Sequence, residues 1–352
     1  MIRVGLVGFG LAGRVFHAPL VSSVEGLELA AVVERTTDNA AARYPGITTY
    51  RTVDELLADA SIKLVVVATP NATHYPLAMT ALQAARHVVV DKPAGMNAAE
   101  IAGLMDLAGG LGLQLIPFHN RRWDGDFKTV HKIVDEHTLG MLAHVQSTFD
   151  RWRPGSSRSA WKEEPEQGGL LLDLGTHLAD QTLQLFGLPD TVSAEIRHER
   201  SGDGAPDAFT VRLHYFTGLN VELSANTLSA LARPRFHLRG TRGNYWKWGL
   251  DPQEDALGKI TRIDDAEWGK DPAEKWGTLA TDEGDGLSTR AFETLPGDYR
   301  AFYAGVRDAI LGTAPAPVTA RDAWQVAHLL ELAEASAKSG RVIECDWSQG
   351  PA

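Results

Sequence analysis

The sequence contains a single cysteine, Cys345, among its 352 residues. No intramolecular disulfide can form and a cysteine-rich zinc site is excluded, which is typical of a protein from the reducing cytoplasm. No run of about twenty uninterrupted apolar residues occurs, so a membrane-spanning helix is not expected. The apolar opening Met1–Gly10 has no Lys/Arg-rich flank or cleavage site, and we interpret it as a first strand rather than a signal peptide. We therefore expect a cytoplasmic protein outside the membrane.

The sequence also has fewer basic than acidic residues. Lysine and arginine number 34 against 45 acidic residues, which gives a formal net charge of −11. General binding to nucleic acid or to an anionic membrane needs clustered basic residues, so the composition argues against both partners. The apolar fraction of 44% and the chain length favour a folded protein of two domains, 1–120 and 121–352.

Short apolar strands alternate with helix-length segments in the first third of the chain. The expected strands are Ile2–Val7, Leu27–Val33, Leu64–Ala68, His87–Val90 and Gln114–Pro117. The expected helices between them are Ala12–Val24, Asn39–Arg43, Val53–Asp59, His74–Ala84 and Ala98–Leu107. Apolar strands separated by helices predict a parallel sheet that is covered on both faces.

The pattern changes after about His119. A helix is predicted over Asp126–Glu136, and alternating runs predict further strands at His144–Arg151, Val192–His198, Phe209–Phe216, Leu219–Ala225, Phe236–Arg239 and Tyr245–Trp248. Residues 250–289 are rich in Asp, Glu, Gly and Pro and indicate either a solvated loop or a flap ordered by Trp268 and Trp276. The last predicted elements are helices at Tyr299–Leu311 and Ala320–Ser339 and a strand at Arg341–Cys345. One possible arrangement has these helices packed against the first domain.

A glycine-rich motif follows the first strand, with the sequence Gly8-Phe9-Gly10-Leu11-Ala12-Gly13. The first glycine of such a motif permits a tight turn, the second lets the backbone approach a pyrophosphate, and the third lets helix and strand pack closely. Its position between a strand and a helix, in a chain of repeated β-α units, predicts a dinucleotide site. The predicted fold class is α/β, with an N-terminal Rossmann domain and a C-terminal α+β domain built on a large, mostly antiparallel, open sheet.

The second strand ends in two residues that favour different cofactors. Glu34 can bind the adenine ribose hydroxyls and would repel a 2′-phosphate, which favours NAD, whereas Arg35 could pair with that phosphate. We expect NAD or NADP, with a small preference for NAD. Thr69, Pro70 and Asn71 follow the strand Leu64–Ala68 at the edge where ligands gather, and Asn71 either caps the next helix or contacts the nicotinamide ribose. The nearby His74 is a further candidate for cofactor binding.

A lysine follows another buried strand in Val88-Val89-Val90-Asp91-Lys92-Pro93. Lys92 should project toward the same crevice as the dinucleotide, where alcohol oxidation needs a positioned acid or base. Asp91 is a candidate cofactor contact. The alternative is that Lys92 only reaches solvent at a strand end.

The segment Gly168–Asp180 predicts a mostly buried helix with one polar stripe. At 3.6 residues per turn Asp173, His177 and Asp180 share this stripe, and Asp173 lies one turn from His177, so its carboxylate could orient the imidazole. Three interpretations stay open: a structural Asp–His pair, part of a metal site without a convincing third ligand, or a pair for substrate binding and proton transfer. We predict the last, with no metal, provided that Lys92 faces the pair.

Together these motifs resemble the Gfo/Idh/MocA oxidoreductase family. The resemblance rests on V-G-F-G-L-A-G at Val7–Gly13, A-T-P-N at Ala68–Asn71, D-K-P at Asp91–Pro93 and G-G-L-L-L-D-L-G-T-H at Gly168–His177, in that order over nearly the whole chain. Within the family, F-H-A-P at Phe16–Pro19, H-N-R-R-W-D-G-D-F at His119–Phe127 and F-D-R-W-R-P at Phe149–Pro154 are similar to a scyllo-inositol dehydrogenase-like subgroup.

The resemblance implies oxidation of a sugar or cyclitol, or the reverse reduction, with NAD(H) or NADP(H). It implies that Lys92 is the catalytic lysine and that Asp173 and His177 are its acidic and histidine partners. Family members commonly have Glu where Asp91 stands, so the reach of Asp91 to a ribose hydroxyl is in question. The open sheet of the family often forms oligomer contacts, which implies a homodimer or homotetramer.

Further residues near the expected domain junction are candidates for substrate binding: Asn120, Arg151, Arg153 and Trp161. Arg can hold hydroxyl or carboxylate groups and Trp can stack on a sugar ring, although a structural role is open for each. In our hypothesis the substrate hydroxyl lies between Lys92 and His177, and one of them accepts its proton. Two rivals remain, a dinucleotide-dependent sensor without turnover and a reductase of a non-sugar carbonyl or imine.

Overall fold

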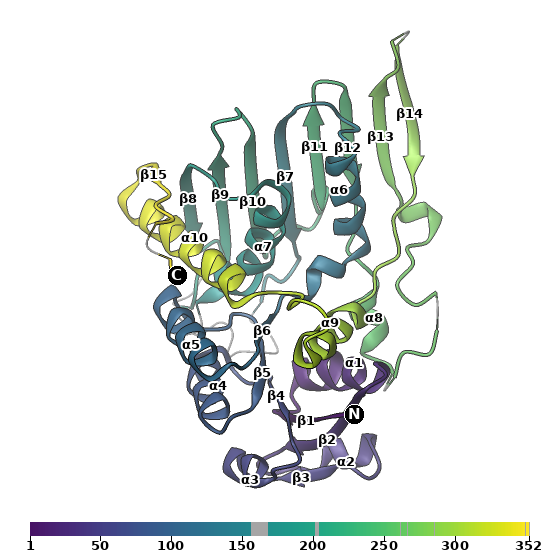
Figure 1. Ribbon diagram of the computed structural model, residues 1–352. Coiled ribbons are helices and arrows are strands. Elements are labelled where there is room, and N and C mark those ends of the chain that lie inside the picture. The colour runs from purple at the N-terminus through teal and green to yellow at the C-terminus, as the bar shows by residue number, and fades with distance from the viewer. Residues whose placement is uncertain are drawn as a thin grey trace.

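The computed structural model describes residues 1–155, 168–200, 204–260, 262–265, 267–284, 286–348 and 350–351. Two sheets organise the chain, a six-stranded sheet near the N-terminus and a nine-stranded sheet beyond it (Figure 1). No helix in these ranges is both long and apolar enough to span a membrane.

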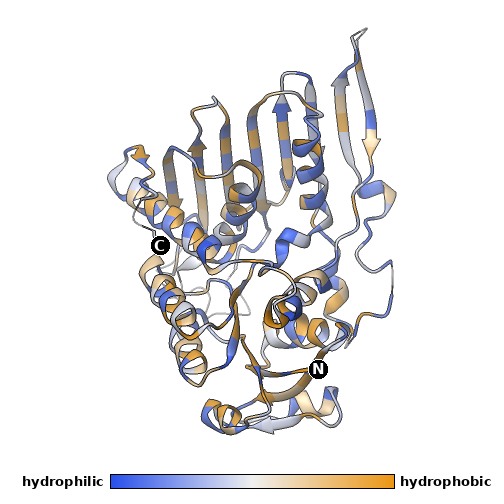
Figure 2. Cartoon of the chain, viewed as in Figure 1, coloured by the Kyte–Doolittle hydropathy of each residue, from blue (hydrophilic) through white to orange (hydrophobic). Residues whose placement is uncertain are grey.

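The first sheet is entirely parallel. Its strands are β1 (Ile2–Val7), β2 (Leu27–Val33), β3 (Thr48–Tyr50), β4 (Leu64–Val67), β5 (His87–Asp91) and β6 (Leu115–Phe118). They lie in the order β3-β2-β1-β4-β5-β6, the arrangement of a Rossmann domain, in which ligands bind at the carboxyl ends where the strand order reverses. The apolar strands β1 and β4 are buried because helices cover both faces, and Figure 2 shows them as mostly hydrophobic ribbons.

The helices of the Rossmann domain are α1 (Ala18–Ser23), α2 (Asn39–Arg43), α3 (Val53–Ala58), α4 (His74–Gln83) and α5 (Ala98–Leu111). Thr52 caps α3 in a reciprocal pair with Glu55, and the side chain of Asn97 caps α5. The predicted helix over Ala12–Val24 is confirmed as a continuous helical run over residues 11–23, with a π-helical turn at Gly13–His17 before α1 that was not predicted. The short strand β3 was not predicted.

The second sheet is mostly antiparallel, as predicted. Its strands are β7 (Leu142–Asp150), β8 (Thr191–Arg197), β9 (Ala208–His214), β10 (Asn220–Asn226), β11 (Phe236–Gly240), β12 (Gly243–Lys247), β13 (Gly277–Asp282), β14 (Leu287–Phe292) and β15 (Ile343–Glu344). Their order is β14-β13-β12-β11-β7-β10-β9-β8-β15, and only β7 and β10 pair in parallel. Hydropathy alternates along the central strands (Figure 2), because one face packs against helices and the other is open.

Helices α6 (Gly125–Asp135), α7 (Thr176–Phe186) and α10 (Ala320–Ser339) lie against the same face of the second sheet (Figure 1). The end of the chain also contacts the first domain. Helix α9 (Arg300–Leu311) packs Phe302 and Val306 into the core around β1, and α10 contacts both α5 and α7. Helix α10 therefore bridges the two domains, since it contacts α5 and β6 of the first domain and α7 and β8 of the second.

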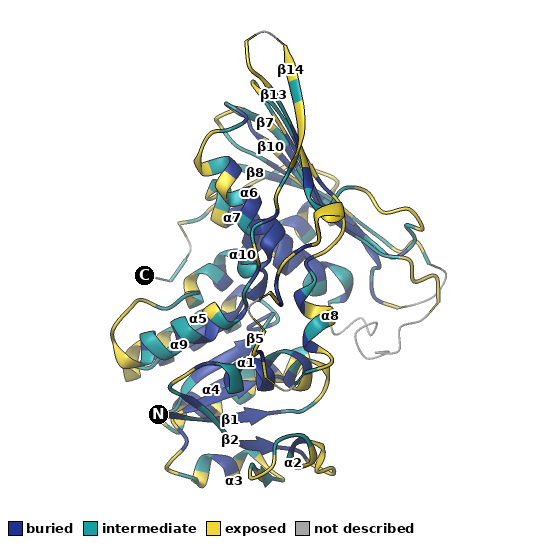
Figure 3. Cartoon of the chain, turned by 90° about the vertical axis from the view of Figure 1, so that its right-hand side faces the viewer, coloured by how far each residue is buried: buried dark blue, intermediate teal, exposed yellow. Residues whose placement is uncertain are grey.

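Of the two predictions for residues 250–289, the purely solvated loop is wrong, and the burial of Trp268 agrees with an ordered segment. The segment contains α8 (Gln253–Leu257), β13 and the start of β14, and the β13–β14 hairpin projects from the sheet with much of β14 exposed (Figure 3). A buried ion pair of 2.8 Å between Lys247 Nζ and Asp271 anchors the segment to β12, and Trp268 is buried. The strands escaped prediction because an exposed hairpin lacks a clear apolar alternation.

Candidate active site

A cleft of about 1390 Å³ opens along the carboxyl ends of the Rossmann strands and continues to the second sheet. Residues after β1, β2, β4, β5 and β6 line it from one side, and residues from the second domain line it from the other. A cleft at this place has the size and position of a dinucleotide site. It joins the glycine motif to Lys92, Asp173 and His177, which lie far apart in the sequence.

The three glycines of the motif have different surroundings. Gly8 has a φ of +96°, and a Cβ there would lie 2.6 Å from the carbonyl oxygen of Ala68. A Cβ on Gly13 would lie 2.1 Å from the carbonyl oxygen of Gly8, so both positions require glycine for the fold itself. A Cβ on Gly10 would meet nothing within 4 Å. The open space over Gly10 belongs to the cleft, so this loop fits a pyrophosphate that approaches the backbone.

Gly10 therefore offers a test that separates cofactor binding from folding. We expect Gly10→Ala to keep the melting temperature of the wild type, because no protein atom opposes the added methyl group. The same methyl should weaken dinucleotide binding by roughly tenfold or more, since it occupies space over the loop. Binding is measured by the fluorescence of reduced cofactor.

The control is Gly13→Ala, in which the methyl group clashes with backbone. This variant should lose about 1–3 kcal/mol of unfolding free energy. Unchanged dinucleotide affinity in Gly10→Ala would show that the cofactor does not lie on this loop.

Most predicted cofactor residues line the cleft: Gly8, Phe9, Gly10, Leu11, Ala12, Glu34, Arg35, Thr69, Pro70, Asn71, Asp91 and Lys92. Gly13 and His74 do not line it. Gly13 packs beneath the loop. The buried ring of His74 contacts the carbonyl oxygens of Pro93 at 2.7 Å and Thr69 at 2.8 Å, so it ties together two loops that line the cleft.

The end of the cleft next to β2, where the sequence predicts the adenosine of the cofactor and which we call the adenosine end, contains Glu34 and two arginines. The carboxylate of Glu34 accepts hydrogen bonds from Thr37 Oγ1 at 2.6 Å and from the backbone N–H of Ala40 at 2.7 Å. Arg51 donates to the backbone carbonyls of Glu34 and Thr37. Arg35 is exposed on the cleft wall and has no hydrogen bond or ion pair to any described residue.

Lys92 and Asp173 form the ion pair at the centre of the cleft. Lys92 Nζ lies 2.9 Å from Asp173 Oδ1 and 2.6 Å from the carbonyl oxygen of the same residue. Asp173 stands in a π-helical turn at Leu171–Gly175 that leads into α7, and such turns widen the helix locally. Arg151 approaches the second carboxylate oxygen to 3.8 Å.

His177 lies on the cleft wall one turn further along. Its Nδ1 is buried and has no hydrogen-bond partner among the described residues. The charge of Asp173 favours the protonated form of this imidazole, and the orienting role of Asp173 stays a prediction. Burial, followed by the charges of Lys92 and Arg121, lowers the pKa of His177 well below its usual value. The imidazole is therefore neutral at neutral pH and can accept a proton.

The remaining acidic residues near the cleft have structural partners. Asp180 pairs with Arg122 at 2.6 Å and does not line the cleft, so this member of the predicted polar stripe is paired inside the protein. Asp91 accepts a hydrogen bond from the backbone N–H of Lys92. Burial alone would raise the pKa of Asp91, but neighbouring His17 and the charges around it lower the pKa to about 2. The carboxylate of Asp91 is therefore ionised at neutral pH, and it lines the cleft.

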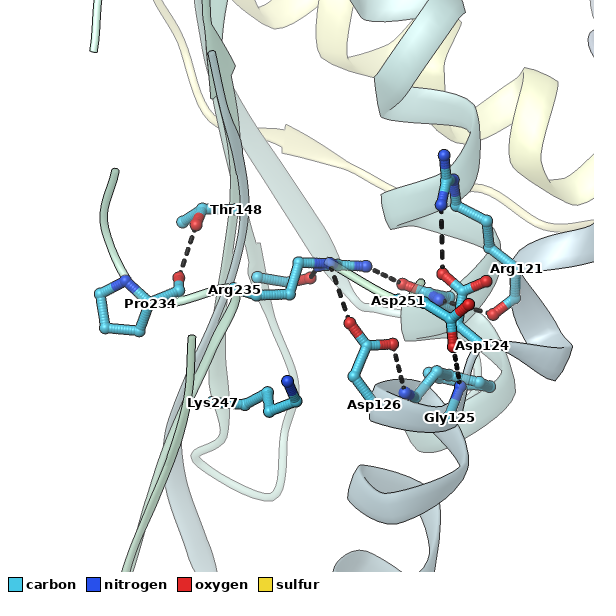
Figure 4. Close-up of polar contacts among 12 residues, drawn as sticks. Arg121, Asp124, Gly125, Asp126, Thr148, Pro234, Arg235, Lys247 and Asp251 are labelled. Carbon is cyan, nitrogen blue, oxygen red and sulfur yellow. Dashed lines mark hydrogen bonds and ion pairs between the residues drawn. The ribbon is translucent and has the colours of Figure 1, made fainter. Parts of the chain in front are cut away.

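Of the four further candidates for substrate binding, Asn120, Arg151 and Arg153 line the second-domain end of the cleft, and Trp161 lies outside the described residues. Sequence reasoning missed Arg121 and Glu254, which also line it and pair at 2.8 Å. Arg121 also contacts Asp124, and Figure 4 shows both beside a buried network that continues through Asp126. The only sequence signal for Arg121 was its place in H-N-R-R-W.

No cluster of three or more potential metal-ligating side chains occurs in the part of the chain that the structure describes. The Asp173 carboxylate, which a metal ion in the cleft would need as a ligand, already forms an ion pair with Lys92.

Two family models match the chain. One, described as the NAD-binding Rossmann fold of an oxidoreductase family, matches residues 2–119, and the C-terminal alpha/beta domain of the same family matches residues 131–345. The chain belongs to the Gfo/Idh/MocA oxidoreductase family. This confirms the predicted fold class and the family resemblance.

Several family members resemble the chain over nearly its whole length. It is 41% identical to the uncharacterized oxidoreductase YdgJ of Escherichia coli (strain K12) over 96% of each protein. It is 34% identical to the scyllo-inositol 2-dehydrogenase (NADP(+)) IolW of Bacillus subtilis (strain 168), covering 97% of this chain and 95% of IolW. The structure of the YPO2259 putative oxidoreductase from Yersinia pestis superposes with a TM-score of 0.92 at 43% identity, covering 97% of each chain.

Proposed function

We propose that this family member transfers a hydride between a nicotinamide dinucleotide and the hydroxyl-bearing carbon of a sugar or cyclitol. The observation that carries the proposal is the shared cleft. It brings the ion pair of Lys92 with Asp173 and a neutral, buried His177 to the same cavity as an open glycine loop. An alcohol dehydrogenase needs these three elements together.

The residues divide the work of alcohol oxidation. Bound nicotinamide supplies the acceptor for the hydride that leaves the substrate carbon. As the hydride leaves, the hydroxyl oxygen must lose its proton to form the carbonyl, and His177 is the neutral base on the cleft wall. The ammonium group of Lys92, fixed by Asp173, donates a hydrogen bond to the same oxygen and stabilises the negative charge that develops there. In the reverse reduction His177 returns the proton.

The adenosine end of the cleft favours NADP(H) in our proposal. The carboxylate of Glu34, which favoured NAD, already accepts two hydrogen bonds from its own loop. Arg35 remains as a donor on the same wall, suited to a 2′-phosphate. IolW carries NADP(+) in its name, which is consistent with this choice.

We expect Arg35→Gln to reduce the preference for NADP over NAD by about tenfold, because one charge-assisted contact to the 2′-phosphate is lost. The measurement is the ratio of kcat/KM for the two cofactors. Arg262→Gln, at an exposed arginine beyond the cleft lining, is the control. A ratio that stays unchanged in Arg35→Gln would remove Arg35 from cofactor recognition.

The activity itself is tested by following the absorbance of reduced nicotinamide with a series of sugars and cyclitols, including scyllo-inositol, and with NAD and NADP separately. We expect turnover with at least one polyol. Tight dinucleotide binding without turnover of any polyol would instead favour a dinucleotide-dependent sensor that has no enzymatic activity. Turnover only with carbonyls or imines that are not sugars would favour a reductase of such compounds.

We further propose that copies of the chain assemble through the open face of the second sheet. The row of residues across this face runs through Arg212, Glu222, Gln146, His237 and Trp246, and Trp246 is 44% exposed. An exposed tryptophan in a row of paired polar side chains is typical of an interface. Sedimentation should give the mass of a dimer or tetramer, and Trp246→Glu should lower it.

A further inference from the structure

Two arginines point toward the cleft from an extended segment that follows β7. The backbone N–H of Arg151 donates to the carbonyl of Asn226 at 3.0 Å, and that of Arg153 donates to Thr227 at 2.7 Å. Trp152 forms an isolated bridge with Leu228 between them. Alternate residues of an extended chain face the same side, so Arg151 and Arg153 both line the cleft while Trp152 is 58% exposed. The backbone thus fixes both arginines at the substrate end.

The charges at this end of the cleft do not balance. Among the described residues, four basic and three acidic side chains line it: Lys92, Arg121, Arg151, Arg153, Asp91, Asp173 and Glu254. All three acids are already engaged. Asp173 bonds to Lys92 at 2.9 Å and Glu254 bonds to Arg121 at 2.8 Å, while Asp91 accepts a hydrogen bond from the backbone N–H of Lys92 and lies 3.8 Å from the ring of His17. The local excess of positive charge runs against the net charge of −11 for the whole chain. It is therefore a feature of the site rather than of the composition.

Among these basic side chains, Arg151 is largely buried and has no hydrogen bond to a carboxylate of the described residues. Its side chain is only 21% exposed, and its nearest carboxylate oxygen among the described residues, on Asp173, is 3.8 Å away, beyond hydrogen-bond distance. Burial lowers the pKa of Arg151. The positive charges of Arg153 and Arg121 lower this pKa further, whereas the negative charges of Asp173 and Glu254 raise it. A guanidinium that is buried beside other cations is costly unless an anion joins it.

We propose that Arg151 and Arg153 bind an anionic group of the substrate, so that the enzyme prefers a sugar or cyclitol that carries a carboxylate or a phosphate ester. The fork of a guanidinium donates two parallel hydrogen bonds to either group. The proposal rests on the oxidoreductase function above and narrows its substrate class. The name of the relative IolW refers to an uncharged cyclitol, so this inference distinguishes the chain from that protein.

The test compares sugars with the same ring and different charge: D-glucose, D-glucuronate and D-glucose 6-phosphate. Binding to the protein saturated with reduced cofactor is measured by calorimetry, and oxidation is measured in parallel. We expect at least one anionic sugar to bind about tenfold or more tightly than glucose, with an advantage that shrinks at high salt. Equal binding of all three would overturn the proposal. Binding in this order without turnover would leave the anion site standing and contradict the oxidoreductase function instead.

Arg151→Gln and Arg153→Gln show whether the arginines cause the preference. Each should reduce the ratio of anionic to neutral affinity by about tenfold. Arg197→Gln, at an arginine that pairs with Glu195 and Glu199 and does not line the cleft, is the matched control. The affinity for reduced cofactor is measured in the same variants. If cofactor affinity falls tenfold while the substrate ratio stays unchanged, the arginines bind the cofactor phosphates, and the proposal is wrong.

Discussion

Lys92→Ala is expected to lower kcat by about a thousandfold while the protein still binds dinucleotide. The side chain holds its position through two contacts to Asp173, and its ammonium group faces the cavity in which we place the reacting hydroxyl. Without it, the oxyanion that develops during hydride transfer loses its closest positive charge. The glycine loop and the adenosine end are untouched, so cofactor affinity should change by less than about threefold.

The measurement is single-turnover hydride transfer with saturating cofactor, together with fluorescence titration of the reduced cofactor. Lys338→Ala is the control, since this lysine is exposed near the end of α10 and does not line the cleft. Asp173→Asn should lower kcat in the same direction, because Lys92 then loses the anion that fixes it. Wild-type turnover in Lys92→Ala would remove the lysine from the chemistry.

The sequence predicted the Rossmann half of the molecule closely. The bounds of β1 and β2 match the predicted Ile2–Val7 and Leu27–Val33, because both strands are mostly apolar and largely buried, with Gly8 just after β1 and Gly26 just before β2. The hairpin β13–β14 did not emerge from the sequence. Its side chains are largely exposed, and pairing with β12, a tertiary interaction, places it in the sheet.

The candidate site was predicted by residue but not by geometry. The motifs placed Lys92, Asp173 and His177 together, and the structure brings all three to one cleft. The family resemblance implied that Asp173 is the acidic partner of Lys92. A periodicity of 3.6 residues alone does not foresee the π-helical turn in which Asp173 stands. Arg121 lies in the motif H-N-R-R-W but Glu254 lies in no motif, so only the folded chain shows that the two side chains meet at the cleft.

His177→Gln should lower kcat for polyol oxidation by about a hundredfold to ten thousandfold, because the reaction loses its base. The pH dependence gives a sharper test. Since the pKa of His177 lies well below 6.5, wild-type kcat/KM should stay constant as the pH falls through 6.5 and decline only in more acidic solution, where the imidazole gains a proton. Glutamine cannot titrate, so the acidic decline should vanish in His177→Gln while the residual rate stays low.

His119→Gln is the matched control for this profile. His119 is also a buried histidine whose pKa is lowered by burial, but it does not line the cleft. Its replacement should preserve the acidic decline and most of kcat, because the titrating base remains in place. If the decline instead disappears in His119→Gln and persists in His177→Gln, the proton leaves the substrate by another route, and the role of His177 is only to shape the cleft.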